Sequence, residues 1–244
     1  IFKHFFGGLA SNWANPMAIT IIIAWFCGSV FFPQSQITRT MLESANPASA
    51  LFAQGILPNQ GQTSAFTDFI NGKVFSHLGI MIPDGYSALF WDSHSLIPAF
   101  RFNLFTLAAS ILLISFSMSE SLVPAVYLLV YGVLVRFFSL TPFTGSTGNG
   151  DIFLALLTSG TLFCAFFMLP YYGTMPLSTA GKMIYGCIAG ILAFLISGCG
   201  LSSVGSVFTV IAVNAISPLI QFMEEKCYTF FRTDTLQTRE ENER

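Results

Sequence analysis

Six apolar runs, each too long for a β-strand, follow one another along this chain. They cover residues 16–32, 102–118, 122–140, 151–169, 182–199 and 203–220. A helix that crosses a bilayer needs about 20 mostly apolar residues, or about 17 where the bilayer is thin. Only 9% of the 244 residues are charged, against about 25% in soluble domains. The sequence therefore predicts an all-α, polytopic membrane helix bundle with about six spans.

Polar residues divide the chain into four parts. Residues 1–32 form a broken-helix start and the first span, 33–101 a long excursion, 102–220 a five-span bundle, and 221–244 a polar tail. With six spans, most Lys and Arg residues lie on the side of the membrane that holds the C-terminal tail. Because Lys and Arg favour the cytoplasmic side, this predicts a cytoplasmic C-terminus and an external segment 33–98. Because the chain begins at Ile1 without an initiator Met or a signal peptide, we expect further residues upstream.

Composition also excludes several kinds of site. The net charge is −2 without a basic run, so no nucleic-acid partner is expected. The five Cys and three His residues lack the spacing of metal ligands, and no catalytic triad or carboxylate pair is present. The pair Gly186 and Gly190, four residues apart in an apolar run, predicts close packing between spans.

Two polar interruptions at apolar runs are candidate ion-path positions. Asn15 precedes Pro16 at the start of the first run, and Asn214 lies four residues before Pro218 in the last. Helix breaks at corresponding positions of two halves are typical of central sites in transporters. The alternatives are a turn that starts a helix, for Asn15, and a hydrogen bond between helices, for Asn214.

These segments resemble the RnfD and NqrB membrane subunits of ion-translocating oxidoreductases. The opening Lys-His-Phe-Phe-Gly-Gly with Asn12, Asn15 and Pro16 resembles a KHxFGG…NxxNPA pattern of that family. Three further stretches resemble family motifs in the same order: residues 165–176, 181–190 and 213–220. The resemblance covers nearly the whole chain.

The resemblance implies a membrane fold of about ten helices in two related halves, similar to urea and ammonium channels, of which this chain is the C-terminal part. It implies a subunit of a complex in the bacterial inner membrane, with membrane lipid and other membrane and peripheral subunits as partners. Rnf complexes pass electrons between ferredoxin and NAD, Nqr complexes between NADH and quinone, and both translocate Na⁺ or H⁺.

The resemblance also implies FMN, joined by a phosphoester to a Thr in an external motif by a flavin transferase, and possibly riboflavin. The counterpart here places Ser49 at the acceptor position, with Glu43 and Asn46 in the same motif. Pro47 stands where the family has Gly, which fixes φ at that point. An Rnf-type electron-carrying subunit is therefore the first expectation. The alternatives are an Nqr-type subunit and an ion-path scaffold or channel without flavin.

Overall fold

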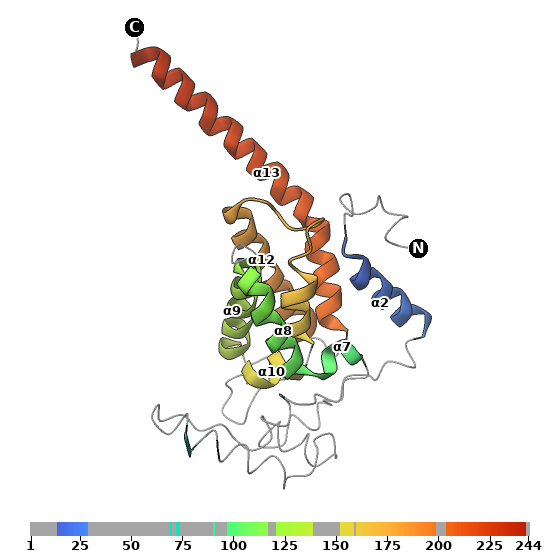
Figure 1. Cartoon of the computed structure of the whole chain (residues 1–244). Coiled ribbons are helices and arrows are strands. Elements are labelled where there is room, and N and C mark those ends of the chain that lie inside the picture. The colour runs from blue at the N-terminus through green and yellow to red at the C-terminus, as the bar shows by residue number, and fades with distance from the viewer. Residues whose placement is uncertain are drawn as a thin grey trace.

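The described part of the structure, a computed structural model, is helical throughout (Figure 1). It comprises residues 14–28, 69, 72–73, 90, 97–116, 121–138, 152–158, 160–198 and 204–242, with side chains described as far as residue 229. The elements are α2 (Pro16–Cys27), α7 (Pro98–Arg101), α8 (Asn103–Phe116), α9 (Leu122–Phe137), α10 (Ile152–Thr158), α11 (Thr161–Phe163), η5 (Cys164–Met168), α12 (Thr179–Ala193), η6 (Phe194–Gly198) and α13 (Gly205–Asn242). Two of these, η5 and η6, are π-helical turns.

Each of the six apolar runs contains one of these helices or a short series of them. Two stretches are long and apolar enough to cross a membrane, Thr179–Ser197 and Gly205–Thr229. Three shorter apolar helices accompany them: α2, α8 and α9. This is consistent with a membrane helix bundle. Nearly all of the excursion predicted at 33–98 lies outside the described residues.

Helix α12 packs closely against α9 at the predicted glycine pair. A Cβ on Gly186 would lie 3.1 Å from the carbonyl oxygen of Val123, and one on Gly190 would lie 2.7 Å from Cβ of Val130. The two glycines therefore let the backbone of α12 approach α9 more closely than any side chain would allow. The prediction of tight packing at this pair is confirmed.

The segment that joins α10 to α11 turns at Gly160, which adopts a left-handed conformation with φ of 68°. A Cβ there would lie 2.6 Å from the ring of Phe100, so both the backbone and the neighbouring ring require glycine. Beside this turn, the amide of Asn103 at the start of α8 donates to the carbonyl of Leu157, at 2.8 Å. These contacts fix the α10–α11 joint against α7 and α8.

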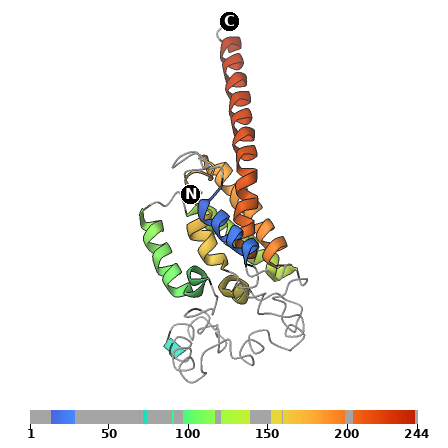
Figure 2. The same cartoon turned by 90° about the vertical axis from the view of Figure 1, so that its right-hand side faces the viewer.

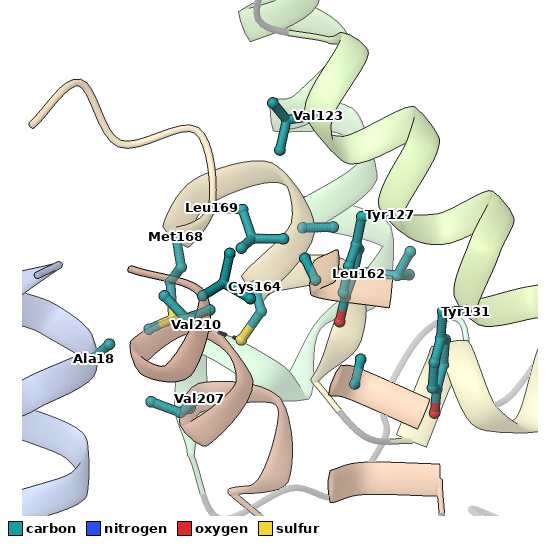
Figure 3. Close-up of a cluster of buried hydrophobic side chains, with 14 of the residues drawn as sticks. Ala18, Val123, Tyr127, Tyr131, Leu162, Cys164, Met168, Leu169, Val207 and Val210 are labelled. Carbon is teal, nitrogen blue, oxygen red and sulfur yellow. Dashed lines mark hydrogen bonds between the residues drawn. The ribbon is translucent and has the colours of Figure 1, made fainter. Parts of the chain in front are cut away.

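The core lies between α9, η5, α12 and α13, with α2 packed on its edge (Figure 3). Tyr127 and Tyr131 of α9 are fully buried, and their rings stack with centroids 6.3 Å apart. Helix α2 contacts α13 through Trp25 and Phe208, whose ring centroids lie 5.6 Å apart. The two helices run in opposite directions (Figures 1 and 2).

Helix α13 is much longer than the bundle that it belongs to. It contains 38 residues, which corresponds to about 57 Å. Its first part packs on α12 and α2, and its C-terminal part projects away from the other helices (Figures 1 and 2). The polar tail predicted from residue 221 is helical as far as Asn242.

The α9–α12 contact leads to a testable prediction. Gly190→Ala should lower the free energy of unfolding by about 1–3 kcal/mol, because the added methyl group collides with Cβ of Val130. Gly132→Ala in α9 is the matched control, since its Cβ would meet Ile152 at an ordinary 3.4 Å. The measurement is denaturant unfolding of the detergent-solubilised protein. Equal stability of the two variants would contradict the packing described here.

Candidate functional site

Of the five residues singled out in the sequence, the structure describes two. Asn15 and Asn214 are both buried, with 3% and 0% of their surfaces exposed. Glu43, Asn46 and Ser49, the candidate flavin-attachment residues, lie outside the described residues. The geometry of the site is therefore that of the two asparagines and their neighbours.

Asn15 joins the start of α2 to the helix of the fourth apolar run. Its Oδ1 accepts a hydrogen bond from the backbone N–H of Met17 at 2.9 Å, so the side chain caps α2 just before Pro16. Its Nδ2 donates to the backbone carbonyl of Met168, also at 2.9 Å. Both polar atoms of this buried amide are thus paired.

The carbonyl that Asn15 binds belongs to the π-helical turn η5. Within η5 the N–H of Leu169 bonds the carbonyl of Cys164, five residues earlier, at 2.9 Å. Helix ends leave carbonyls that need partners from elsewhere, and π turns occur often at functional sites. The Met168 carbonyl, at the end of η5, receives its hydrogen bond from α2.

Asn214 lies in the first third of α13 and binds α12. Its Oδ1 accepts a hydrogen bond from the hydroxyl of Tyr185 at 2.7 Å, which is the helix-to-helix contact considered for this residue. Its Nδ2 is buried and has no hydrogen-bond partner among the described residues. Pro218, four residues later, has no N–H to bond the backbone carbonyl of Asn214. Asn214 therefore presents a donor that the described part of the protein does not pair, beside a carbonyl without its usual helical partner.

The expected helix break at Pro218 is not present, because α13 runs through this residue without interruption. The neighbouring Ser217 is buried, and its hydroxyl donates to the backbone carbonyl of Thr174. Thr174 belongs to the connection between η5 and α12. Pro218 itself is exposed, and the hydrogen bond of its neighbour Ser217 ties this turn of α13 to the connection before α12.

The two asparagines lie near the same part of the core. Trp25 near the end of α2 contacts Phe208 near the start of α13, with ring centroids 5.6 Å apart. Asn15 precedes Trp25 in the chain, and Asn214 follows Phe208 along α13. Because α2 and α13 run in opposite directions, both amides lie on the same side of this contact.

The chemistry of this site is that of neutral oxygen and nitrogen atoms. Its side chains are amides and hydroxyls, joined by backbone carbonyls at Met168 and Thr174. Within the part of the chain that the structure describes, no group of three or more His, Cys, Asp or Glu gathers as a metal site would require. Such a site can bind a water molecule or a monovalent cation through carbonyl, amide and hydroxyl oxygens.

Sequence reasoning missed Tyr185, Thr174 and the Met168 carbonyl as members of the site. Tyr185 is 29 residues from Asn214, and Thr174 is 43 residues from Ser217. No local spacing connects residues so far apart in the chain. The nearest signal is the buried Asn214 itself, which requires a partner from another helix.

Comparison with known proteins extends the resemblance from four short motifs to nearly the whole chain. The sequence model of the NQR2, RnfD, RnfE family matches residues 1–229. The D-type subunit of the proton-translocating ferredoxin:NAD(+) oxidoreductase complex of Clostridium ljungdahlii is 25% identical over 225 residues, which are 90% of this chain and 62% of that protein. The D-type subunit of the ion-translocating oxidoreductase complex of Rhodobacter capsulatus is 25% identical over 205 residues, 80% of this chain and 56% of that protein.

A third relative, from the ion-translocating oxidoreductase complex of Mannheimia succiniciproducens and again of the D type, is 23% identical over 237 residues, 89% of this chain and 65% of its own length. The chain thus spans about three fifths of the length of these relatives. The match of the family model over almost the whole chain confirms the resemblance of the four motifs. The chain belongs to the NQR2, RnfD, RnfE family.

Proposed function

We propose that this chain is the D-type membrane subunit of an Rnf-like complex that couples electron transfer between ferredoxin and NAD to the translocation of Na⁺ or H⁺. The observation that carries the proposal is the family match over residues 1–229. The relatives are named as subunits of ion-translocating oxidoreductase complexes. The partners of this chain would be the other membrane and peripheral subunits of such a complex in the bacterial inner membrane.

In this proposal the ion path passes the two buried asparagines. Asn15 and Asn214 lie on the same side of the α2–α13 contact, in a bundle whose other core residues are mostly apolar. Polar groups at that depth are costly, so proteins keep them where they serve a path or a site. The unpaired Nδ2 donor of Asn214 supports a bound water molecule at this point of the path, because the N–H can donate to the oxygen of water.

The electron-carrying part of the proposal depends on Ser49. A serine hydroxyl can form the same phosphoester with FMN that a threonine forms, and a bound flavin would supply one-electron transfer. Glu43 and Asn46 belong to the same segment, which a flavin transferase would have to reach from outside the membrane. The cytoplasmic position of the C-terminus is part of this proposal too.

A second function has one observation in its favour. Pro47 stands in place of a glycine in the attachment motif, and proline restricts the backbone where the transferase must bind. The chain would then be an ion-path scaffold without flavin. An Nqr-type complex that uses quinone is the further alternative within the same family.

The flavin prediction is tested by peptide mass spectrometry on protein co-expressed with its flavin transferase. Trypsin cuts after Arg39 and Lys73, so one peptide carries Ser49. We expect this peptide to gain the mass of FMN less water, and Ser49→Ala to abolish the gain. Ser44→Ala, in the same peptide, is the control that should keep it. An unmodified peptide from an assembled, active complex would favour the scaffold without flavin.

The ion-path prediction is tested at the hydrogen bond between Tyr185 and Asn214. Tyr185→Phe removes the hydroxyl and leaves Oδ1 of Asn214 without its donor, so stability should fall by about 1–3 kcal/mol. We also expect fewer ions translocated per electron in proteoliposomes. Ser115→Ala, which removes an exposed hydroxyl on α8, is the control that should change neither quantity. A loss of stability with an unchanged ratio of ions to electrons would show that the Tyr185–Asn214 hydrogen bond has a structural role only and is not part of the ion path.

A further inference from the structure

A line of polar side chains runs along one face of α13 from the centre of the bundle to its end. Asn214, Ser217, Gln221 and Glu224 follow one another at intervals of three or four residues, which places them on one side of a helix. Asn214 and Ser217 are buried, Gln221 is exposed and Glu224 is half-buried. The line therefore leads from the interior of the protein to its surface.

Neighbouring groups join the members of this polar line. Nε2 of Gln221 approaches Oγ of Ser217 at 3.4 Å, and Ser217 in turn donates to the carbonyl of Thr174. At the outer end, the hydroxyl of Ser178 donates to Oε1 of Glu224. Thr174 and Ser178 both belong to the connection before α12, which therefore contacts the polar line at Ser217 and at Glu224.

Glu224 is held in place while remaining open to its surroundings. Its carboxylate lies over the first turn of α12, where a Cβ on Gly181 would collide with Oε1. It also lines an open pocket of about 690 Å³ whose other walls include Ile184, Met223 and Tyr228. A carboxylate in mostly apolar surroundings that keeps access to the outside is a suitable place to bind and release a cation.

The two ends of the polar line differ in charge: a carboxylate lies at the outer end, and a neutral amide donor lies at the inner end. Glu224 and Glu225 are the carboxylates among the described side chains, and Glu225 is exposed. Lys182 lies buried in the first turn of α12 and has contacts of its own. At the inner end of the line, Nδ2 of Asn214 has no partner among the described residues. A buried donor of this kind calls for a water molecule or another acceptor next to it.

We propose that Glu224 is the carboxylate at which a monovalent cation, H⁺ or Na⁺, passes between the surface and the ion path, and that the polar line along α13 connects it to Asn214. This inference rests on the proposed function and adds to it the mouth of the path. The hydroxyl and amide groups between the two residues would carry the ion with the help of water. Ser178 orients the carboxylate through its hydrogen bond to Oε1.

The first test is Glu224→Gln, with Glu225→Gln as its matched control on the neighbouring position of the same helix. Glutamine keeps an oxygen that accepts from Ser178, so the contact with α12 is preserved while the charge is lost. The whole complex is reconstituted into proteoliposomes, and electron transfer is measured with the ion gradient dissipated. We expect Glu224→Gln to keep this electron transfer within about twofold and to lose about tenfold or more in ion uptake. Glu225→Gln should change neither rate, and wild-type uptake by Glu224→Gln would overturn the inference.

A second test does not depend on redox activity. Dicyclohexylcarbodiimide adds to protonated carboxyl groups in apolar surroundings, and peptide mass spectrometry of the complex locates the adduct. We expect Glu224 to react faster than Glu225. Protection by Na⁺ at constant pH would assign Na⁺, whereas dependence on pH alone would assign H⁺. No adduct on Glu224, or equal reaction of both residues, would overturn the inference even if the complex carries electrons.

These two measurements separate failure of the inference from failure of the proposed function. If the wild-type complex transfers no electrons and moves no ions, the proposed function fails, while the labelling of Glu224 still reports on ion access. If the wild type does both and Glu224→Gln behaves like Glu225→Gln, the inference alone fails.

Discussion

The direct contact of α12 with α9 positions the rest of the candidate site. At Gly186 and Gly190 α12 contributes no side chain to the contact, so its backbone lies directly against α9 and α12 cannot rotate about its axis without separating from it. Tyr185, next to Gly186, is thereby held against the opposite neighbour, α13, where its hydroxyl meets Asn214. The geometry of the polar site is in this way a consequence of glycine packing on the other side of α12.

Polar groups inside this bundle form their hydrogen bonds mostly with one another, because the surrounding side chains are mostly apolar. In an apolar environment an unpaired amide or hydroxyl costs several kcal/mol, on the order of 2–7. Asn15 avoids this cost by joining α2 to η5, and Ser217 by joining α13 to the connection before α12. The same bonds link elements far apart in the sequence. The polar groups of the candidate site thus also hold the helices in register.

Much of the helical arrangement could be predicted from the sequence, because apolar periodicity and length are local properties. The runs at 182–199 and 203–220 correspond to α12 with η6 and to α13, and the glycine pair packs as expected. Of the two interpretations of Asn214, the hydrogen bond between helices is present, whereas the helix break at Pro218 is not, since α13 runs through this residue. The partners of Asn214 and Ser217 come from other segments, which local spacing cannot reveal.

The extended length of α13 has a mechanical consequence. From Pro218 to Asn242 the helix rises about 36 Å, and its last part stands clear of the bundle (Figure 2). A tilt of only about 5° at the proline would displace the far end by about 3 Å. The polar site lies next to the pivot of this arm. A change of hydrogen bonding too small to disturb the core would thus be amplified into a movement of several ångströms at the far end of the helix.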